Sequence, residues 1–289
     1  MNKKLQKKIM DILHNPAISD EEAEKQIQAI MSEFGIDEEE FIDTPTTNAY
    51  NLLEKAENAK TKVQAIKLAK EAYKTSNECF DAILFQVDLE DDSVKRLSLL
   101  NEGLEIEKKR LEKEEYFTKD NIGSFYGMLE TRPYIRGLYT KAHLLLEDGK
   151  IRLTKDVCEE IIRLNNNDNT GARYLLMAIY AYLEEEKELL KLYKKYPEEN
   201  LEILYPLFSL YYKLEDNKKA KEYLDRINKA NPNFIKYFKG TIKEDNAPYG
   251  YYSIGSPSEV FMYIDSYMFL VDSTPNIGNF IISNSKNKK

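Results

Sequence analysis

The sequence LEDGK at residues 146–150 returns as LEEEK at residues 183–187 and as LEDNK at residues 214–218. The Leu-Glu pairs that open these stretches are 37 and 31 residues apart, an average of 34. Self-similarity at a period of about 20–50 residues is typical of proteins built from stacked repeats. Each stretch lies between segments with helical spacing of apolar residues, which indicates a turn between two helices.

Two earlier turns extend the pattern toward the N-terminus. Residues 89–92 read LEDD and residues 57–60 read ENAK, with Glu90 and Glu57 33 residues apart. Between the turns, apolar residues keep one helical face, as at Ile66, Ala69 and Tyr73, and strand alternation is almost missing. We therefore predict an all-α fold, a superhelical stack of antiparallel helix pairs.

The spacing of the turns also predicts how the chain is divided. The 57 residues from Glu90 to Glu147 contain one repeat plus an insertion near residues 113–129, where glycines break the helical pattern. The predicted parts are an acidic N-terminal helical segment at residues 1–45, helical repeats at residues 46–240, and a C-terminal arm with capping helices at residues 241–289.

Both ends of the chain are predicted to carry helices of their own. The N-terminal segment reads as helices at residues 3–14 and 19–34, with Ser19 and Glu22 at capping-box spacing. Near the other end, Ser256 caps a helix that continues to Val271, and a shorter helix occupies residues 274–282. Because the open end of a repeat stack needs cover, we expect these last helices to cap the final repeat.

Composition and charge restrict the possible partners. The net charge is −8, and residues 1–43 hold five Lys against eleven Asp and Glu, so this segment accounts for −6 of it. An acidic segment repels phosphates and no basic block follows, so we expect no nucleic-acid partner. Cys79 and Cys158 read as reduced core thiols of a cytoplasmic protein. The sequence contains neither a signal-peptide core nor a membrane-spanning stretch, so no membrane partner is expected.

Small residues at close-packing positions point to a known superfamily. Ala65, Ala69 and Ala72 suit a second repeat helix, Gly137 with Ala142 suits a first one, and KAKEYL at residues 219–224 is followed by a terminating NPN. Over residues 46–234 the chain therefore resembles the tetratricopeptide-repeat (TPR) superfamily, although it lacks the family's Trp and its spacings of 37 and 31 differ from the family norm. Residues 131–138 (TRPYIRGL), 163–176 (RLNNNDNTGARYLL) and the tail are similar to a bacterial TPR group distantly related to the suppressor-of-tumorigenicity family.

The resemblance implies a concave surface lined by the first helix of each repeat. Counted back from the Leu-Glu turns, Arg136 and Arg173 occupy equivalent places, and an Arg fork suits a carboxylate. TPR domains that clamp peptide C-termini carry cations at similar places. The candidate peptide-binding residues on this predicted face are Arg136, Tyr139, His143, Arg173, Leu176, Tyr180, Leu207 and Tyr211.

A simpler interpretation competes with this groove. Each Arg can pair with a neighbouring acid or cap the turn at residues 167–169, and the Tyr and Leu spacings are also those of ordinary packing between helices. Neither His14 nor His143 stands at the spacing of a metal site or a nucleophile-base pair. The glycines of residues 250–255 (GYYSIG) lack the preceding strand and the Lys of a phosphate loop. No cofactor or metal is therefore expected.

The leading hypothesis is a non-enzymatic adaptor that binds a protein or peptide on the concave face of the array. One alternative is a peptide-sensing transcriptional regulator, although its acidic N-terminal segment suits DNA poorly. The other is an enzyme of a type that the sequence does not identify, which requires a convergent polar pocket.

Overall fold

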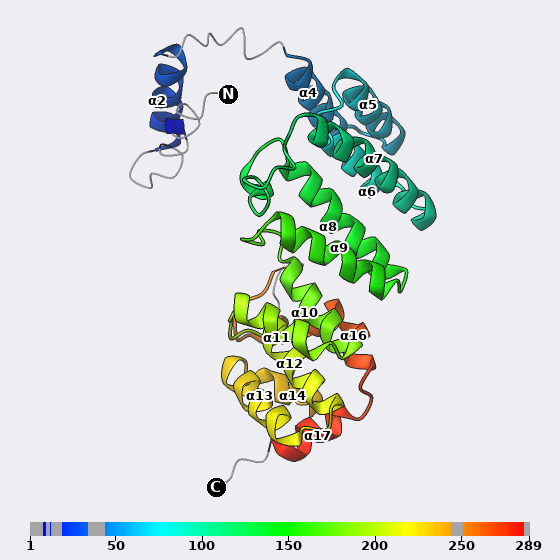
Figure 1. The fold of residues 1–289 in the computed structure, drawn as a ribbon, viewed down its shortest axis with the longest axis vertical. Helices are drawn as coiled ribbons and strands as arrows, with labels where there is room; N and C mark the ends of the chain where they lie inside the picture. Colours follow the sequence, from blue (N-terminus) through cyan, green and yellow to red (C-terminus); the bar gives the residue numbers. More distant parts are fainter. Residues whose placement is uncertain are drawn as a thin grey trace. The chain divides into compact units, whose positions relative to one another are not determined.

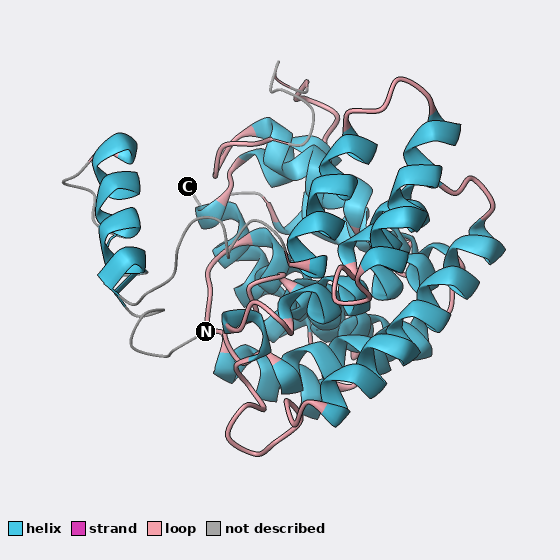
Figure 2. Cartoon of the chain, turned by 90° about the horizontal axis from the view of Figure 1, so that it is seen from above, coloured by secondary structure: helices cyan, strands magenta, loops and turns pink. Residues whose placement is uncertain are grey.

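The computed structural model describes residues 8, 9, 12, 19–33, 44–243, 245 and 251–285. Within these ranges the regular structure consists of fifteen α-helices and one short 3-10 helix, with no β-strand (Figure 1, Figure 2). The all-α prediction is confirmed. Most of the predicted first helix, the acidic run at residues 36–41, His14 and Gly250 lie outside the described residues. In the described part of the chain, no helix has both the length and the apolar composition needed to cross a bilayer.

The chain divides into two compact units, residues 1–107 and residues 108–289. In the first unit, Ser19 Oγ accepts a hydrogen bond from the Glu22 backbone amide at 3.3 Å, as the capping-box spacing predicts. Buried alanines, among them Ala49, Ala69 and Ala72, form much of its core, and their small side chains let helices approach closely. The helices are α2 (Asp20–Glu33), α4 (Pro45–Glu57), α5 (Lys62–Thr75), α6 (Asp81–Leu89) and α7 (Ser93–Lys113), whose last residues belong to the second unit.

The second unit contains three packed helix pairs, and each turn within a pair falls on one of the predicted Leu-Glu stretches. Neighbouring pairs also pack together, because α10 contacts both α9 and α12. The pairs are α8 (Arg132–Glu147) with α9 (Ile151–Leu164), α10 (Ala172–Leu183) with α11 (Glu186–Lys195), and α12 (Leu201–Lys213) with α13 (Asn217–Ala230).

The three turns share one backbone geometry, which fixes the register between the pairs. Gly149, Glu184 and Glu215 each adopt a left-handed conformation, with φ of 69°, 61° and 59°. The amide that follows each of them donates to a carbonyl five residues back, at 2.8 Å in the first turn and 2.9 Å in the other two. This arrangement satisfies carbonyls that the helix end leaves without a partner. Equivalent positions are therefore 35 residues apart between α8 and α10, and 31 between α10 and α12.

The register corrects the first of the predicted spacings. The pair Leu146-Glu147 lies two residues before the left-handed position, whereas Glu184 and Glu215 occupy that position themselves. The spacing of 31 between turns agrees with the left-handed positions, and the spacing of 37 is two residues longer than theirs. Two residues correspond to a rotation of about 200° around an α-helix. An alignment that is wrong by two residues therefore assigns α8 side chains to the opposite face of the helix.

The predicted insertion is a loop that docks on the next helix pair. Residues 114–131 contain only the 3-10 helix η1 (Phe125–Gly127). The Gly123 amide donates to the Leu164 carbonyl at 3.0 Å, and the Gly123 carbonyl accepts from the Asn166 amide at 2.8 Å. Phe125 of this loop is fully buried, so the loop contributes to the core of the second unit.

Four short helices follow α13, and the last three, within residues 257–284, form a C-terminal segment that covers more than the final helix pair. Ser256 Oγ accepts from the Glu259 amide at 3.2 Å, which confirms the predicted cap. The predicted long helix is divided at Tyr267. Ring contacts tie the segment to first helices of the repeats, with Tyr263 at 5.4 Å from Tyr205 and Phe269 at 5.8 Å from Tyr182. The helices are α14 (Asn233–Phe238), α15 (Pro257–Ser266), α16 (Met268–Asp272) and α17 (Ile277–Asn284) (Figure 1).

Both cysteines are buried and free. Cys79 lies in the first unit and Cys158 on α9 of the second. Burial raises the pKa of Cys79 to about 11 and raises that of Cys158 further. Both thiols are therefore protonated at neutral pH.

Candidate binding groove of α9, α10 and α11

The side chain of Arg173, a predicted peptide anchor, is engaged in ion pairs within the protein. Its guanidinium donates to Asp168 Oδ2 at 2.9 Å and to Glu198 Oε1 at 2.8 Å, and its side chain is 16% exposed. The guanidinium carbon also lies 4.1 Å from the centroid of the Tyr174 ring. Arg173 thus joins the loop before α10 to the loop before α12. These contacts are the ones that the simpler interpretation predicted, an Arg paired with neighbouring acids.

Asp168 completes this cluster by starting α10. Its buried carboxylate accepts from the backbone amides of Ala172 at 2.8 Å and Arg173 at 2.9 Å. These amides would otherwise have no partner at the helix N-terminus. Burial raises the pKa of Asp168, and the Arg173 hydrogen bonds oppose that effect. The turn at residues 167–169 is therefore fixed by an ion pair inside the protein.

The two arginines are not equivalent. With the observed offset of 35 residues, Arg136 corresponds to Gly171, and Arg173 corresponds to Leu138. Because of the rotation described above, Arg136 and Arg173 occupy opposite faces of equivalent helices. The observed register therefore does not support one cationic clamp, which the sequence predicted from a first-turn spacing that is two residues longer.

The remaining predicted side chains lie in three different surroundings. Tyr139 and His143 are one turn apart on α8, with ring centroids at 4.6 Å in an edge-to-face contact. Leu207 and Tyr211 are buried on α12, and the Tyr211 ring stacks on Tyr223 of α13 at 5.7 Å. For this α12 pair the ordinary packing interpretation holds. Leu176 and Tyr180 line a hollow of the second unit.

That hollow is a groove of about 490 Å³ formed by α9, α10 and α11. Leu176 and Tyr180 of α10 form its floor and are almost fully buried, at 1% and 5% exposure. The walls come from the second helices of two pairs, not from first helices as the sequence predicted. The residues that line the groove are Glu159, Ile162, Leu176, Tyr180, Glu188, Lys191, Leu192 and Lys195. We call this set the α9–α11 groove.

Charges of opposite sign occupy the two ends of the groove. At one end Tyr180 donates its hydroxyl proton to Glu159 Oε1 at 2.9 Å, and Glu188 stands on the α11 wall. Burial and the Glu159 carboxylate raise the pKa of Tyr180. At the other end Lys195 donates to Asn166 Oδ1 at 3.0 Å. Since Glu188 and Lys195 are seven residues apart on one helix, the ends are separated by about 10 Å.

Sequence reasoning missed six of the eight groove residues. Four of them, Glu188, Lys191, Leu192 and Lys195, follow the i, i+3, i+4, i+7 spacing of one helix face. That spacing was visible in the sequence. The α9 wall, however, is brought to α11 only by tertiary packing, which periodicity does not reveal.

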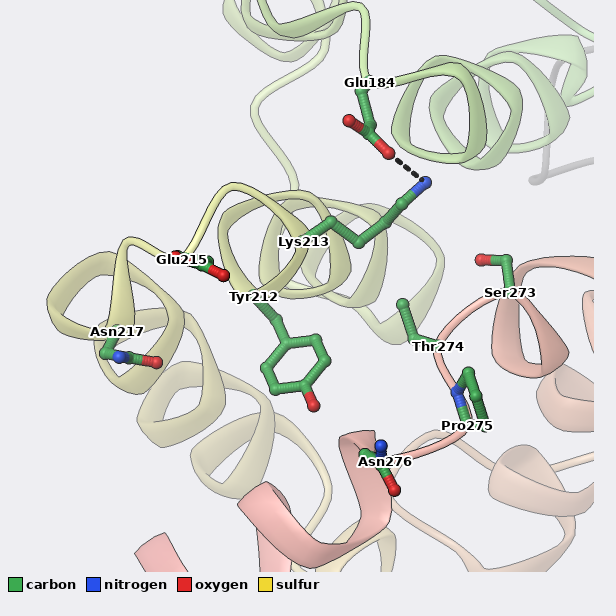
Figure 3. A pocket seen from close by; sticks show the side chains of 9 residues that line it. All are labelled: Glu184, Tyr212, Lys213, Glu215, Asn217, Ser273, Thr274, Pro275 and Asn276. Carbon is green, nitrogen blue, oxygen red and sulfur yellow. Dashed lines mark ion pairs between the residues drawn. The ribbon is translucent and has the colours of Figure 1, made fainter.

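A second hollow, of about 610 Å³, lies where α10, α12 and α13 meet the loop after α16 (Figure 3). Lys213 extends into it and pairs with Glu184 at 3.1 Å. The same ammonium donates to the Ala181 and Tyr182 carbonyls at 3.2 and 2.6 Å, so it caps the C-terminus of α10. Because its cation is already engaged in this way, the second hollow is a weaker candidate than the α9–α11 groove.

No protein-family model matches the chain, and no curated protein matches it either. The resemblance to TPR proteins therefore stays a prediction. Among the described residues, no group of three His, Cys, Asp or Glu side chains is placed to hold a metal ion.

Proposed function

We propose that this chain is a non-enzymatic scaffold, a TPR-like array that binds a protein or peptide segment in the α9–α11 groove. The groove itself carries the proposal, because it joins an apolar floor to exposed charges at both ends. Binding sites for peptides and ligands combine an apolar surface with a few charged groups that fix orientation. The acidic end selects a cation, the basic end selects an anion, and the floor takes an apolar side chain.

The helix that forms the floor is held at both ends, which favours binding. Asp168 and Arg173 fix the start of α10, and Lys213 caps its last carbonyls. A surface that is already ordered loses little conformational freedom when a partner binds. The polar clusters around α10 therefore support the groove without contacting the bound segment.

The first-helix surface near α10 and α12 is a poorer candidate. The aromatic rings of the C-terminal segment pack there, and Tyr263 and Leu270 are buried in that contact. A partner on this surface would first have to displace an ordered part of the chain. We therefore place the partner on the side of the second helices.

Site-specific photo-cross-linking tests the proposal. A photo-reactive amino acid replaces Lys191, an exposed residue of the groove, or Glu222, its equivalent 31 residues later on α13. We expect protein adducts in cell extract from position 191 and few from position 222. The adducts at 191 should disappear when Leu192→Tyr fills the groove. Adducts of equal yield at both positions, or none at either, would contradict binding in the groove.

A further inference from the structure

The repeat that follows the α9–α11 groove contains a filled version of the same surface. With the offset of 31 residues, Tyr211 on α12 corresponds to Tyr180, and three α13 residues correspond to the α11 wall. Lys219 stands at the place of Glu188, Tyr223 at that of Leu192 and Arg226 at that of Lys195. The start of each wall helix confirms the offset, because α11 begins at Glu186 and α13 at Asn217.

In this second repeat the chain supplies both groups that cover the tyrosine. The Tyr223 ring stacks on Tyr211 with centroids 5.7 Å apart and an interplanar angle of 7°. The Lys219 ammonium lies 4.3 Å from the centroid of the Tyr211 ring. An aromatic ring and a cation are both favourable neighbours of a tyrosine face. The surface of α12 and α13 is thus closed by its own side chains.

The α9–α11 groove differs at the two residues that matter most. Leu192 replaces the stacking ring of Tyr223, and Glu188 replaces the cation of Lys219. Among the described residues, no aromatic ring or cation is placed over the face of Tyr180. Two carboxylates, Glu159 and Glu188, stand beside it instead. The groove is open because the sequence omits the groups that close its neighbour, and its acidic end replaces a positive charge by negative ones.

From this comparison we infer that the α9–α11 groove binds a peptide segment in which an aromatic side chain adjoins a Lys or Arg. The aromatic ring packs against Leu192 and the exposed part of Tyr180, on the side of the groove where Tyr223 covers Tyr211 in the next repeat. The cation lies between Glu159 and Glu188, where it competes with Lys191, whose ammonium lies 3.7 Å from Glu188 in an exposed and therefore weak ion pair. This inference rests on the proposed function and specifies the chemistry of the partner.

The absence of tryptophan from the sequence provides a clean assay. The probe is the blocked pentapeptide acetyl-Gly-Lys-Trp-Lys-Gly-amide, whose indole is excited at wavelengths that the 21 tyrosines of the protein do not absorb, so that its emission reports binding. The comparison peptide replaces both Lys by Glu, and a third peptide, with Leu in place of Trp, serves as a competitor. For the full-length chain we expect saturable binding of the basic peptide with a Kd at least tenfold lower than that of the acidic peptide. The Leu peptide should displace the probe with an inhibition constant at least tenfold higher than the Kd of the probe.

Two variants locate the binding. Glu188→Lys combined with Leu192→Tyr recreates the closed surface of the next repeat, and we expect it to weaken the basic peptide at least tenfold. Glu222→Lys on α13 makes the same change of charge beside the closed surface and should leave the Kd within twofold. If circular dichroism shows that the double variant does not fold, the single variant Glu188→Lys provides the test, because the Glu188 side chain is exposed.

The outcomes separate the inference from the proposed function. Equal affinity for the basic and acidic peptides, or undiminished binding by both groove variants, overturns the inference. If cross-linking at position 191 still yields a partner in that case, the groove binds a segment of different chemistry and the proposed function stands. If the cross-linking also fails, both are wrong.

Discussion

Asp168 adopts a backbone conformation that non-glycine residues seldom use, with φ of 46°. The conformation allows its carboxylate to reach two amides at the start of α10 while it also pairs with Arg173. One buried side chain therefore sets the end of a loop, the first turn of a helix and the position of the neighbouring loop. The charge network is compact, and each member depends on the others.

Removal of this carboxylate should destabilise the protein strongly. We expect Asp168→Ala to lower the free energy of unfolding by about 3 kcal/mol or more, because it leaves the Arg173 charge short of a partner and uncaps α10. Urea unfolding followed by circular dichroism measures the change. Glu160→Ala is the matched control, since Glu160 pairs with Arg163 on the exposed surface of α9, and it should cost less than about 1 kcal/mol. Equal losses in the two variants would contradict the structural role of Asp168.

At the residue level the sequence predicted which side chains matter near the groove better than it predicted what each of them does. It drew attention to Arg173, Leu176 and Tyr180, and all three are important to the region around the groove. Their roles follow from neighbours that are distant in sequence, such as Glu198 for Arg173 and Glu159 for Tyr180. Periodicity in the sequence assigns a side chain to one face of a helix, but it does not reveal which residues of other elements contact that side chain.

At the scale of elements, the ends of helices could be predicted because they depend on local turn chemistry. The five predicted turns all separate consecutive helices. The register error arose where the turn contains a glycine, because alignment on Leu-Glu ignored which residue takes the left-handed conformation. Gly149 in LEDGK marks that position, and glycine is the residue most often found there. Alignment on Gly149, Glu184 and Glu215 would have given the observed offset of 35.

The insertion loop depends on another glycine for its contact with the α9–α10 loop. Gly123 has φ of 98°, and a Cβ there would collide with the Asn166 side chain. We expect Gly123→Ala to lower the free energy of unfolding by about 1–3 kcal/mol, through backbone strain and a displaced contact. Gly127→Ala, in the same loop, meets nothing within 4 Å and should change stability by less than about 0.5 kcal/mol. Thermal or urea unfolding that showed no difference between the two would disprove the docking role of Gly123.

At the scale of the whole molecule, the C-terminal segment belongs to the core of the second unit. Val260, Ile264, Leu270 and Ile281 are all buried, and Asn231 Nδ2 donates to Glu259 Oε2 at 2.8 Å to hold α15 at the end of α13. The sequence predicted that the C-terminal segment caps the final repeat, but it did not predict that the segment also packs against α10. Pairing between segments so distant along the chain leaves no periodic trace in the sequence.

Truncation tests how much the second unit depends on this segment. A chain that ends at Gly255 exposes the aromatic surface of Tyr205, Phe208 and Tyr182, so we expect it to lose cooperative unfolding and to aggregate in size-exclusion chromatography. A chain that ends at Ser285 keeps all the described helices and should behave like the full-length protein. A stable, monodisperse product from the shorter chain would show that the segment is dispensable.

The two buried thiols have a practical consequence for work on this protein. Maleimide and similar dyes react with the thiolate form, which Cys79 and Cys158 scarcely populate at neutral pH because burial keeps them protonated. A single cysteine introduced on the surface, for example in place of Lys191 or Glu222, would then take up a fluorophore selectively in an otherwise natural chain. Ligand titrations could in this way be followed optically without first replacing the native cysteines.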